Sequence, residues 1–134
     1  SIADLQGDVR LVNREKGSGI RTLLDELLRT HGISQTQVAG YGQEEKDHIS
    51  VASAVASGAA DVGLGIEKTA RLVDVDFVPI IEESYDIVLL KNDGNEALIS
   101  TVQTILNDAA FQQEIHAIGG YDVSQMGTVV FETI

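Results

Sequence analysis

The spacing of apolar residues along the chain predicts alternating strands and helices. Residues 8–14 alternate apolar and polar positions up to a Gly-Ser-Gly turn, as a strand that enters a turn does. From Ser18 onward apolar residues recur every three or four positions, which predicts an amphipathic helix. We expect a short strand over 36–41, and Asp47 is a suitable N-cap for a second helix that ends before Gly58.

The second half of the chain continues the alternation. The expected elements are a buried strand at 61–66, a brief helix at 67–73, strands at 77–81 and 85–91, and a helical stretch at 95–118. Asn107 and Asp108 interrupt the apolar spacing of this last stretch, so we expect a break there. The tail at 119–134 is less regular.

This order of elements predicts an α/β fold. Strands that alternate with helices need crossover connections, which favour a mostly parallel sheet with helices on both faces, a three-layer helix-sheet-helix arrangement. A chain of 134 residues suits one domain, which we place at 1–134. Aromatic residues make up 4% of the chain and Trp is absent, so we expect an aliphatic core.

Composition narrows the functional classes. A formal net charge of −12 would repel a phosphate backbone, so we expect no direct nucleic-acid contact. The absence of Cys excludes disulfides and zinc-thiolate sites, and the acidic clusters at 43–47 and 82–83 are expected to be solvated, so no metal site is predicted. No apolar run approaches the ~20 residues that span a bilayer. We expect a cytoplasmic location, with the periplasm left open because a cleaved signal peptide would leave no trace.

The segment between the first strand and first helix is the strongest candidate for a ligand site. The first N–H groups of a helix lack internal acceptors and lie at the positive end of the helix dipole. Gly17 and Gly19 let a ligand approach the backbone, Ser18 adds a hydroxyl donor, and Arg14 and Arg21 could add charged donors. The alternative is that Ser18 only caps the helix and both arginines are solvated.

A second group of residues could donate to the same anion. Tyr41, His48 and Ser50 lie near the start of the second expected helix, on the edge of the sheet where parallel strands end. His48 would make binding depend on pH, although a surface histidine and a half-buried loop tyrosine are the simpler interpretation. A hydrolase triad of Ser18, His48 and Asp61 is disfavoured because Ser18 is not in a Gly-x-Ser-x-Gly elbow, so no catalytic residues are predicted.

A family resemblance rests on motifs along nearly the whole chain. The motifs are Val12-Asn13-Arg14, Gly17-Ser18-Gly19, Arg21 to Asp25, Gly40-Tyr41, His48 to Ala52, Val55 to Gly58, Ala60 to Ile66, Asp76 to Pro79, Glu82-Glu83, Tyr85-Asp86 and Gly119 to Asp122. Together they resemble the periplasmic-binding-protein-like domain at the C-terminus of some molybdopterin biosynthesis proteins. Similar domains are fused to helix-turn-helix or excisionase-type DNA-binding domains in regulators.

The resemblance implies a type 2 fold in which two lobes close on a tetrahedral oxyanion. The chain would be one lobe, a fragment of a two-lobe domain, with the hinge strand and C-terminal helices at 85–134. The implied ligand is molybdate or tungstate with no further cofactor, held by Arg14, Ser18 and Gly19. Tyr85 would lie on the hinge strand.

Two residues depart from the family pattern and support an alternative function. Ile20 stands where the family commonly has Thr, and Asp47 stands where Thr commonly precedes His. A ligand-free interaction or dimerisation module, which could form a homodimer, is therefore the alternative. The implied partners are the missing first lobe and other domains of a parent chain, which could be a biosynthetic enzyme or a regulator. The sequence leaves the ligand, the parent protein and the oligomeric state open.

Overall fold

A computed structural model describes residues 1–133 of the protein. The chain forms two compact units, Ser1–Val78 and Pro79–Ile134. Each unit is described by itself below.

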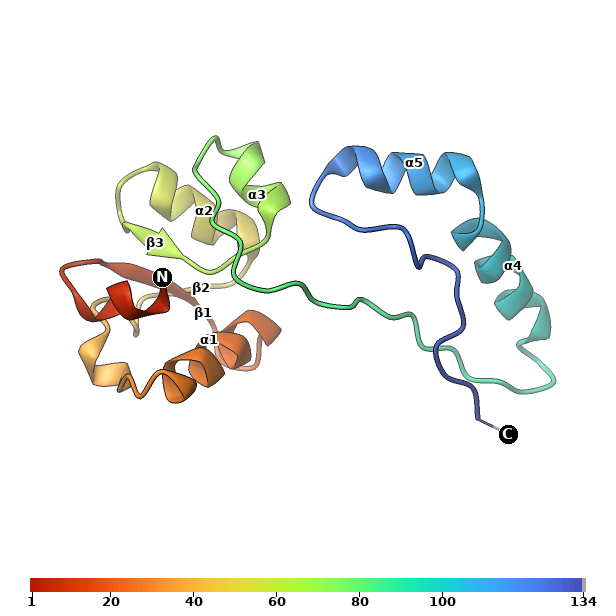
Figure 1. Cartoon of the computed structure of the whole chain (residues 1–134), viewed down its shortest axis with the longest axis horizontal. Helices are drawn as coiled ribbons and strands as arrows, with labels where there is room; N and C mark the ends of the chain where they lie inside the picture. Colours follow the sequence, from red (N-terminus) through yellow and green to blue (C-terminus); the bar gives the residue numbers. More distant parts are fainter. Residues whose placement is uncertain (134) are drawn as a thin grey trace. The chain divides into compact units, whose positions relative to one another are not determined.

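The first unit is a small parallel α/β structure (Figure 1). Its elements are η1 (Ile2–Gln6), β1 (Leu11–Arg14), α1 (Gly19–Thr30), η2 (Gln35–Gln37), β2 (Glu44–Glu45), α2 (His48–Ala56), β3 (Val62–Gly63) and α3 (Glu67–Leu72). The strands lie in the order β2-β1-β3, and β1 pairs in parallel with both neighbours. The predicted α/β class with a parallel sheet is confirmed.

The central strand separates two apolar clusters. Leu11 packs with Leu24 and Leu28 of α1, whereas Val12 packs with Val51 of α2. Successive side chains of a strand point to opposite faces, so α1 and α2 cover opposite faces of the sheet (Figure 1). Full burial of such an aliphatic side chain contributes about 1.5–3 kcal/mol. The core therefore holds the carboxyl end of β1 in a fixed position between two helices.

The prediction of a strand at 36–41 is wrong. The chain there forms η2, whose N-cap Ser34 accepts a hydrogen bond from the N–H of Thr36, and the second strand is instead Glu44–Glu45. Gly40 has a φ of +83°, and a Cβ at this position would lie 2.1 Å from the carbonyl oxygen of Leu11. The backbone therefore turns at Gly40, close against β1. Ala39 accepts one hydrogen bond from the N–H of Leu11, and the parallel ladder with β1 forms after the turn, at Glu44 and Glu45.

The strands expected at 77–81 and 85–91 are not formed as sheet strands. The backbone runs extended through this region without a partner strand among the described residues (Figure 1). The strand expected at 61–66 is present but is limited to β3, Val62–Gly63. An apolar run is thus insufficient for a strand, because the ladder also needs a second edge to bond to.

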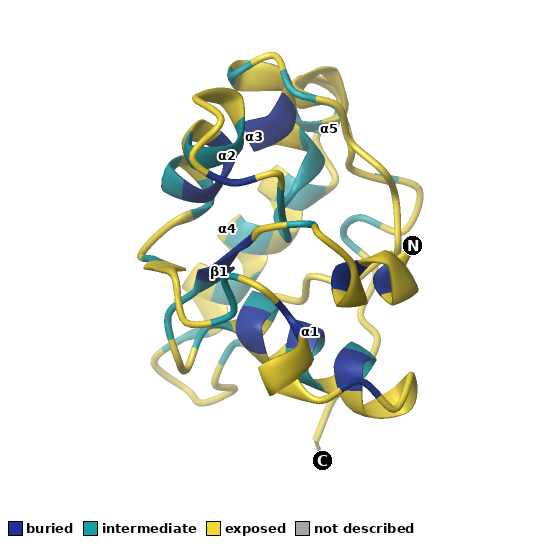
Figure 2. Cartoon of the chain, turned by 90° about the vertical axis from the view of Figure 1, so that its left-hand side faces the viewer, coloured by how far each residue is buried: buried dark blue, intermediate teal, exposed yellow. Residues whose placement is uncertain are grey.

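The second unit contains α4 (Glu96–Leu106) and α5 (Ala109–Ile118), with the break where the sequence predicted it. Asn107 ends α4, and the carboxylate of Asp108 caps α5 by accepting the N–H of Phe111 at 2.9 Å. No residue between 79 and 133 is buried, whereas the first unit has buried residues on η1, β1, α1, α2 and α3, among others (Figure 2). The second unit therefore has no core of its own.

Candidate functional site

The topology of the first unit creates a preferred place for a ligand. β1 leads through α1 to β2 on one side, and β2 leads through α2 to β3 on the other side of β1. In open α/β sheets, ligands bind at the carboxyl ends of the strands where the strand order reverses in this way. α1 and α2 begin at this end of the sheet, each within a few residues of a strand.

The start of α1 offers free backbone donors. Ser18 Oγ accepts the N–H of Arg21 at 3.1 Å, so Ser18 is the N-cap of the helix. The N–H groups of Gly19 and Ile20 donate to no atom of the described residues. Gly17 makes the preceding turn with a φ of +95°, and a Cβ at Gly19 would meet nothing within 4 Å. The two donors are therefore open to a ligand that approaches the backbone.

Arg14 lies beside this helix start, but its charge is already paired. Its guanidinium donates to both carboxylate oxygens of Glu15, at 3.0 and 3.2 Å, and to the carbonyl oxygen of Lys46 at 3.1 Å. The side chain is 11% exposed. Hydrogen bonds from Arg14 lower the pKa of Glu15. Arg14 thus joins the end of β1 to the segment just before α2.

Arg21 is buried in a network of protein acceptors. Nη1 donates to the carbonyl oxygen of Arg14 and to Glu44, both at 2.9 Å, and Nε donates to the hydroxyl of Tyr41 at 3.1 Å. The Tyr41 hydroxyl donates in turn to Asp25 at 2.5 Å. Burial opposes the charge of Arg21, yet hydrogen bonds to Glu44 and Tyr41 raise its pKa. This network connects α1 with the ends of β1 and β2.

Sequence reasoning missed two acceptors of this network. Asp25 follows Arg21 by four residues, a spacing that places both side chains on one face of a helix and could have revealed the pair. Glu44 has no such local signal, because only the pairing of β1 with β2 brings it to Arg21.

His48 is the first residue of α2 and lies close to Arg14 and Glu15. Its Nδ1 is buried and has no hydrogen-bond partner among the described residues. Burial lowers the pKa of His48 below its ordinary 6.5, and the charge of Arg14 lowers it further, while Asp47 and Glu15 act in the opposite direction. The fold therefore brings His48 to the end of β1, from which α1 also starts.

Ser50 is directed to a different surface. Its backbone N–H donates to the carboxylate of Asp47 at 2.7 Å, the cap of α2. Ser50 lines a shallow hollow of about 500 Å³ on α2, together with Ser53 and Ser57. No residue of the segment 14–21 lines that hollow.

Two further residues considered in the sequence are Tyr85 and Asp61. Tyr85 belongs to the second unit and is 96% exposed. Asp61 precedes β3, where it forms a two-pronged ion pair with Arg10 at 2.9 and 3.0 Å. Hydrogen bonds from Arg10 lower the pKa of Asp61 to about 2. Ser18 and Asp61 therefore lie at opposite ends of parallel strands, and the triad of Ser18, His48 and Asp61 is not assembled.

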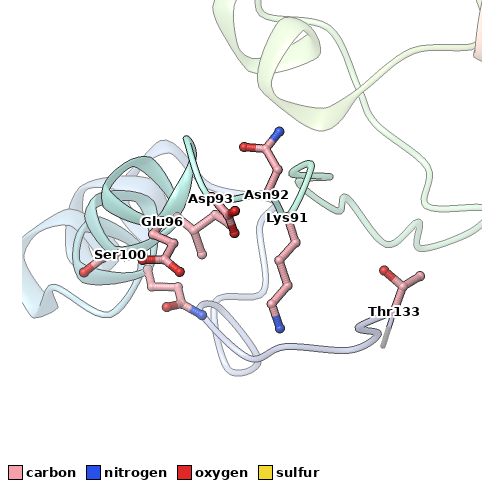
Figure 3. Close-up of a pocket in the computed structure, with 8 residues that line it drawn as sticks. Lys91, Asn92, Asp93, Glu96, Ser100 and Thr133 are labelled. Atoms are coloured by element: carbon pink, nitrogen blue, oxygen red, sulfur yellow. The ribbon is translucent and has the colours of Figure 1, made fainter.

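Other features of the described residues show no additional site. A hollow of about 450 Å³ in the second unit is lined by Lys91, Asn92, Asp93, Glu96, Ser100 and Thr133, among others (Figure 3). No predicted site residue borders it. The described residues hold no group of three or more His, Asp or Glu side chains placed to bind a metal. None of the helices in the described part of the chain is both long and apolar enough to traverse a bilayer.

Comparison with known proteins identifies the family. The PBP superfamily domain matches residues 1–107, and the chain belongs to this periplasmic-binding-protein-like family. The chain is 44% identical over 128 residues to "Uncharacterized protein YvgK" of Bacillus subtilis (strain 168). The matched region covers 96% of this chain but only 41% of YvgK, so the chain spans less than half of that relative. It is 40% identical over 111 residues to "Uncharacterized protein in ferredoxin 2Fe-2S gene 5'region" of Clostridium pasteurianum, covering 82% of this chain and 98% of that protein. No solved structure matches the chain.

Proposed function

We propose that the chain binds a small tetrahedral oxyanion, of the molybdate or tungstate type, at the carboxyl end of β1. The parent protein would serve molybdenum-cofactor biosynthesis or its regulation. The observation that carries the proposal is the pair of free N–H groups at Gly19 and Ile20, with the unpartnered ring nitrogen of His48 at the same end of the sheet. Membership of the PBP family supports ligand binding in general.

Hydrogen bonds, rather than net positive charge, would hold the anion. Arg14 and Arg21 are each paired with carboxylates, so neither contributes an uncompensated charge. The start of α1 contributes backbone donors and a helix dipole equivalent to about half a positive charge. Ser18 can still donate its hydroxyl hydrogen, because its oxygen is the acceptor in the cap. A site of this kind selects an anion by the geometry of its oxygens.

The sharpest test replaces Gly19, because its side-chain position is open. Gly19→Ala adds a methyl group that meets no protein atom within 4 Å, so the fold should persist while the approach to the free N–H groups is blocked. Gly42→Ala is the matched control, since a Cβ there also meets nothing within 4 Å. Calorimetric titration with molybdate, tungstate, sulfate and phosphate should show binding by the wild type and Gly42→Ala, and at least about tenfold weaker binding by Gly19→Ala.

The titration should use both the 134-residue chain and the full product of its gene. Equal affinities of Gly19→Ala and the wild type would remove the start of α1 from the site. No heat with any of the four anions in either polypeptide would contradict anion binding altogether.

A ligand-free interaction module remains the second candidate, and the pairing of both arginines favours it. Arg14 and Arg21 already contact Glu15, Glu44 and Asp25, an arrangement that holds the loops without an anion. Under this alternative the chain would associate with itself or with other domains at an affinity that the four anions leave unchanged. Sedimentation velocity with and without each anion distinguishes the two functions.

A further inference from the structure

The two arginines at the carboxyl end of β1 are held in different ways. The guanidinium of Arg21 donates to a tyrosine hydroxyl, to a carbonyl oxygen and to the carboxylate of Glu44. Among the described residues, the guanidinium of Arg14 has one carboxylate partner, Glu15, and otherwise donates only to the carbonyl oxygen of Lys46. Loss of one carboxylate would therefore leave Arg21 with two acceptors but would free most of the donors of Arg14.

Glu15 can reach Arg14 because it lies just beyond the end of the strand. Within a strand, successive side chains point to opposite faces, so neighbouring residues cannot form a two-pronged contact. β1 ends at Arg14, and the turn that follows begins at Glu15, whose carbonyl oxygen accepts the N–H of Ser18 at 3.3 Å. Glu15 thus belongs to the same short segment, 14–21, as the free N–H groups of α1.

The carboxylate of Glu15 contacts Arg14 in the way that an oxyanion would. Its two oxygens accept Nε at 3.0 Å and Nη2 at 3.2 Å, the fork that a guanidinium offers to carboxylates and phosphates. Hydrogen bonds from Arg14 lower the pKa of Glu15, so the carboxylate is ionised at neutral pH. The side chain of Glu15 is 39% exposed, so water is available to it outside this contact. Glu15 therefore resembles a ligand that is part of the chain.

We propose that Glu15 is an internal competitor of the anion. In the free protein its carboxylate occupies the Nε and Nη2 donors of Arg14, and a bound oxyanion takes this place while the side chain of Glu15 moves into water. This inference rests on the proposed anion site. Because a partly exposed ion pair contributes little to stability, the exchange has a low cost, yet it excludes anions that bond to Arg14 more weakly than a carboxylate does.

A purely structural role for Glu15 predicts the opposite result. If the ion pair of Arg14 and Glu15 only held the segment before α1, its removal would loosen that segment and weaken anion binding. If Glu15 competes with the anion, its removal strengthens binding. The direction of the change in affinity therefore separates the two roles, and damage to the fold cannot produce a gain.

Glu15→Gln tests the proposal, because it removes the charge and keeps the size of the side chain. Calorimetric titration of the 134-residue chain and of the full gene product with molybdate, tungstate and sulfate should show at least about fivefold tighter binding than in the wild type. Glu45→Gln is the matched control, since Glu45 is the ladder partner of Arg14 and borders the hollow on α2. Its substitution removes the same charge and should change the affinity by less than about twofold.

A double substitution shows whether Glu15 acts through Arg14. In an Arg14→Gln background, Glu15→Gln should change the affinity by less than about twofold, because no guanidinium is left to release. An equal gain in both backgrounds, or an equal gain from Glu45→Gln, would overturn the proposal in favour of a general charge effect. Binding that Gly19→Ala weakens but Glu15→Gln leaves unchanged would overturn the competitor alone and retain the anion site. No binding by the wild type or by any variant would contradict both.

Discussion

Arg21 illustrates how single residues define this site. An amphipathic helix that starts after a glycine turn usually carries its arginines in solvent, yet the Arg21 side chain is 5% exposed. Its guanidinium is satisfied by Glu44, by Tyr41 and by a carbonyl oxygen, as a buried charge must be. This arrangement fixes the ends of β1 and β2 beside the free N–H groups of α1. Arg21 thereby supports the geometry of the proposed site through the backbone of Arg14.

His48 should give the folded protein a measurable pH dependence. Because the pKa of His48 is lowered on folding, the unfolded chain binds more protons between that lowered pKa and 6.5. The stability that neutral His48 contributes is therefore complete above pH 6.5 and is lost as the pH falls through the folded-state pKa. The free energy of unfolding, measured in urea from pH 8 to pH 5, should therefore fall less in His48→Gln than in the wild type.

His31→Gln is the matched control for this prediction. His31 is the exposed C-cap of α1, and its Nδ1 lies 2.8 Å from the carbonyl oxygen of Leu27. A bound oxyanion beside His48 would favour the protonated ring, so affinity should also rise as the pH falls below 6.5 in the wild type. If the stability and the anion affinity of His48→Gln depended on pH as those of the wild type do, His48 would not be the titrating group.

At the scale of elements, the packing of α2 on the sheet depends on a residue without a side chain. A Cβ at Gly63 of β3 would lie 2.5 Å from Val51 Cγ1 and 3.1 Å from Val12 Cγ1. Both valines belong to the apolar cluster on the α2 face of the sheet. The strand and the helix can approach this closely only because position 63 is Gly.

Gly63→Ala should therefore destabilise the protein by about 1–3 kcal/mol, the usual cost of forcing an extra methyl group into a packed core. The measurement is the midpoint of urea unfolding, and Gly42→Ala provides the comparison because a Cβ there meets no atom within 4 Å. Equal midpoints for the two variants would show that α2 can move away from β3 at little cost.

On the scale of the whole chain, the two units differ in how much apolar surface they bury. Ser1–Val78 contains two apolar clusters, one on each face of β1. From 79 to 133 no residue is buried, and the extended backbone before α4 forms no ladder with another described segment. Segments with few buried contacts open at low free energy.

Limited proteolysis of the 134-residue chain should reflect this difference. We expect the first cleavages within residues 79–91 and a persisting fragment close to residues 1–78, identified by mass spectrometry. Early cleavage within α1 or α2 instead would contradict an independently stable first unit.

The sequence by itself determined the helices and the class of fold. The starts of α1 and α2 were readable from Ser18 and Asp47, and the division between α4 and α5 from Asn107 and Asp108, because caps and apolar spacing act within a few residues. The sequence also identified Ser18, Gly19 and His48 as candidates at the ends of the strands.

Only the tertiary structure decided which segments pair and what the charged residues contact. The second strand is Glu44–Glu45 and not 36–41, because the backbone turns at Gly40, close against Leu11, and the ladder with β1 is formed by residues after that turn. Glu44 reaches Arg21 only through that pairing, and residues 85–90 remain without a partner despite a strand-like sequence. Strand pairs and the ion pair of Arg21 with Glu44 join residues far apart in the chain, so local patterns carry no information about them.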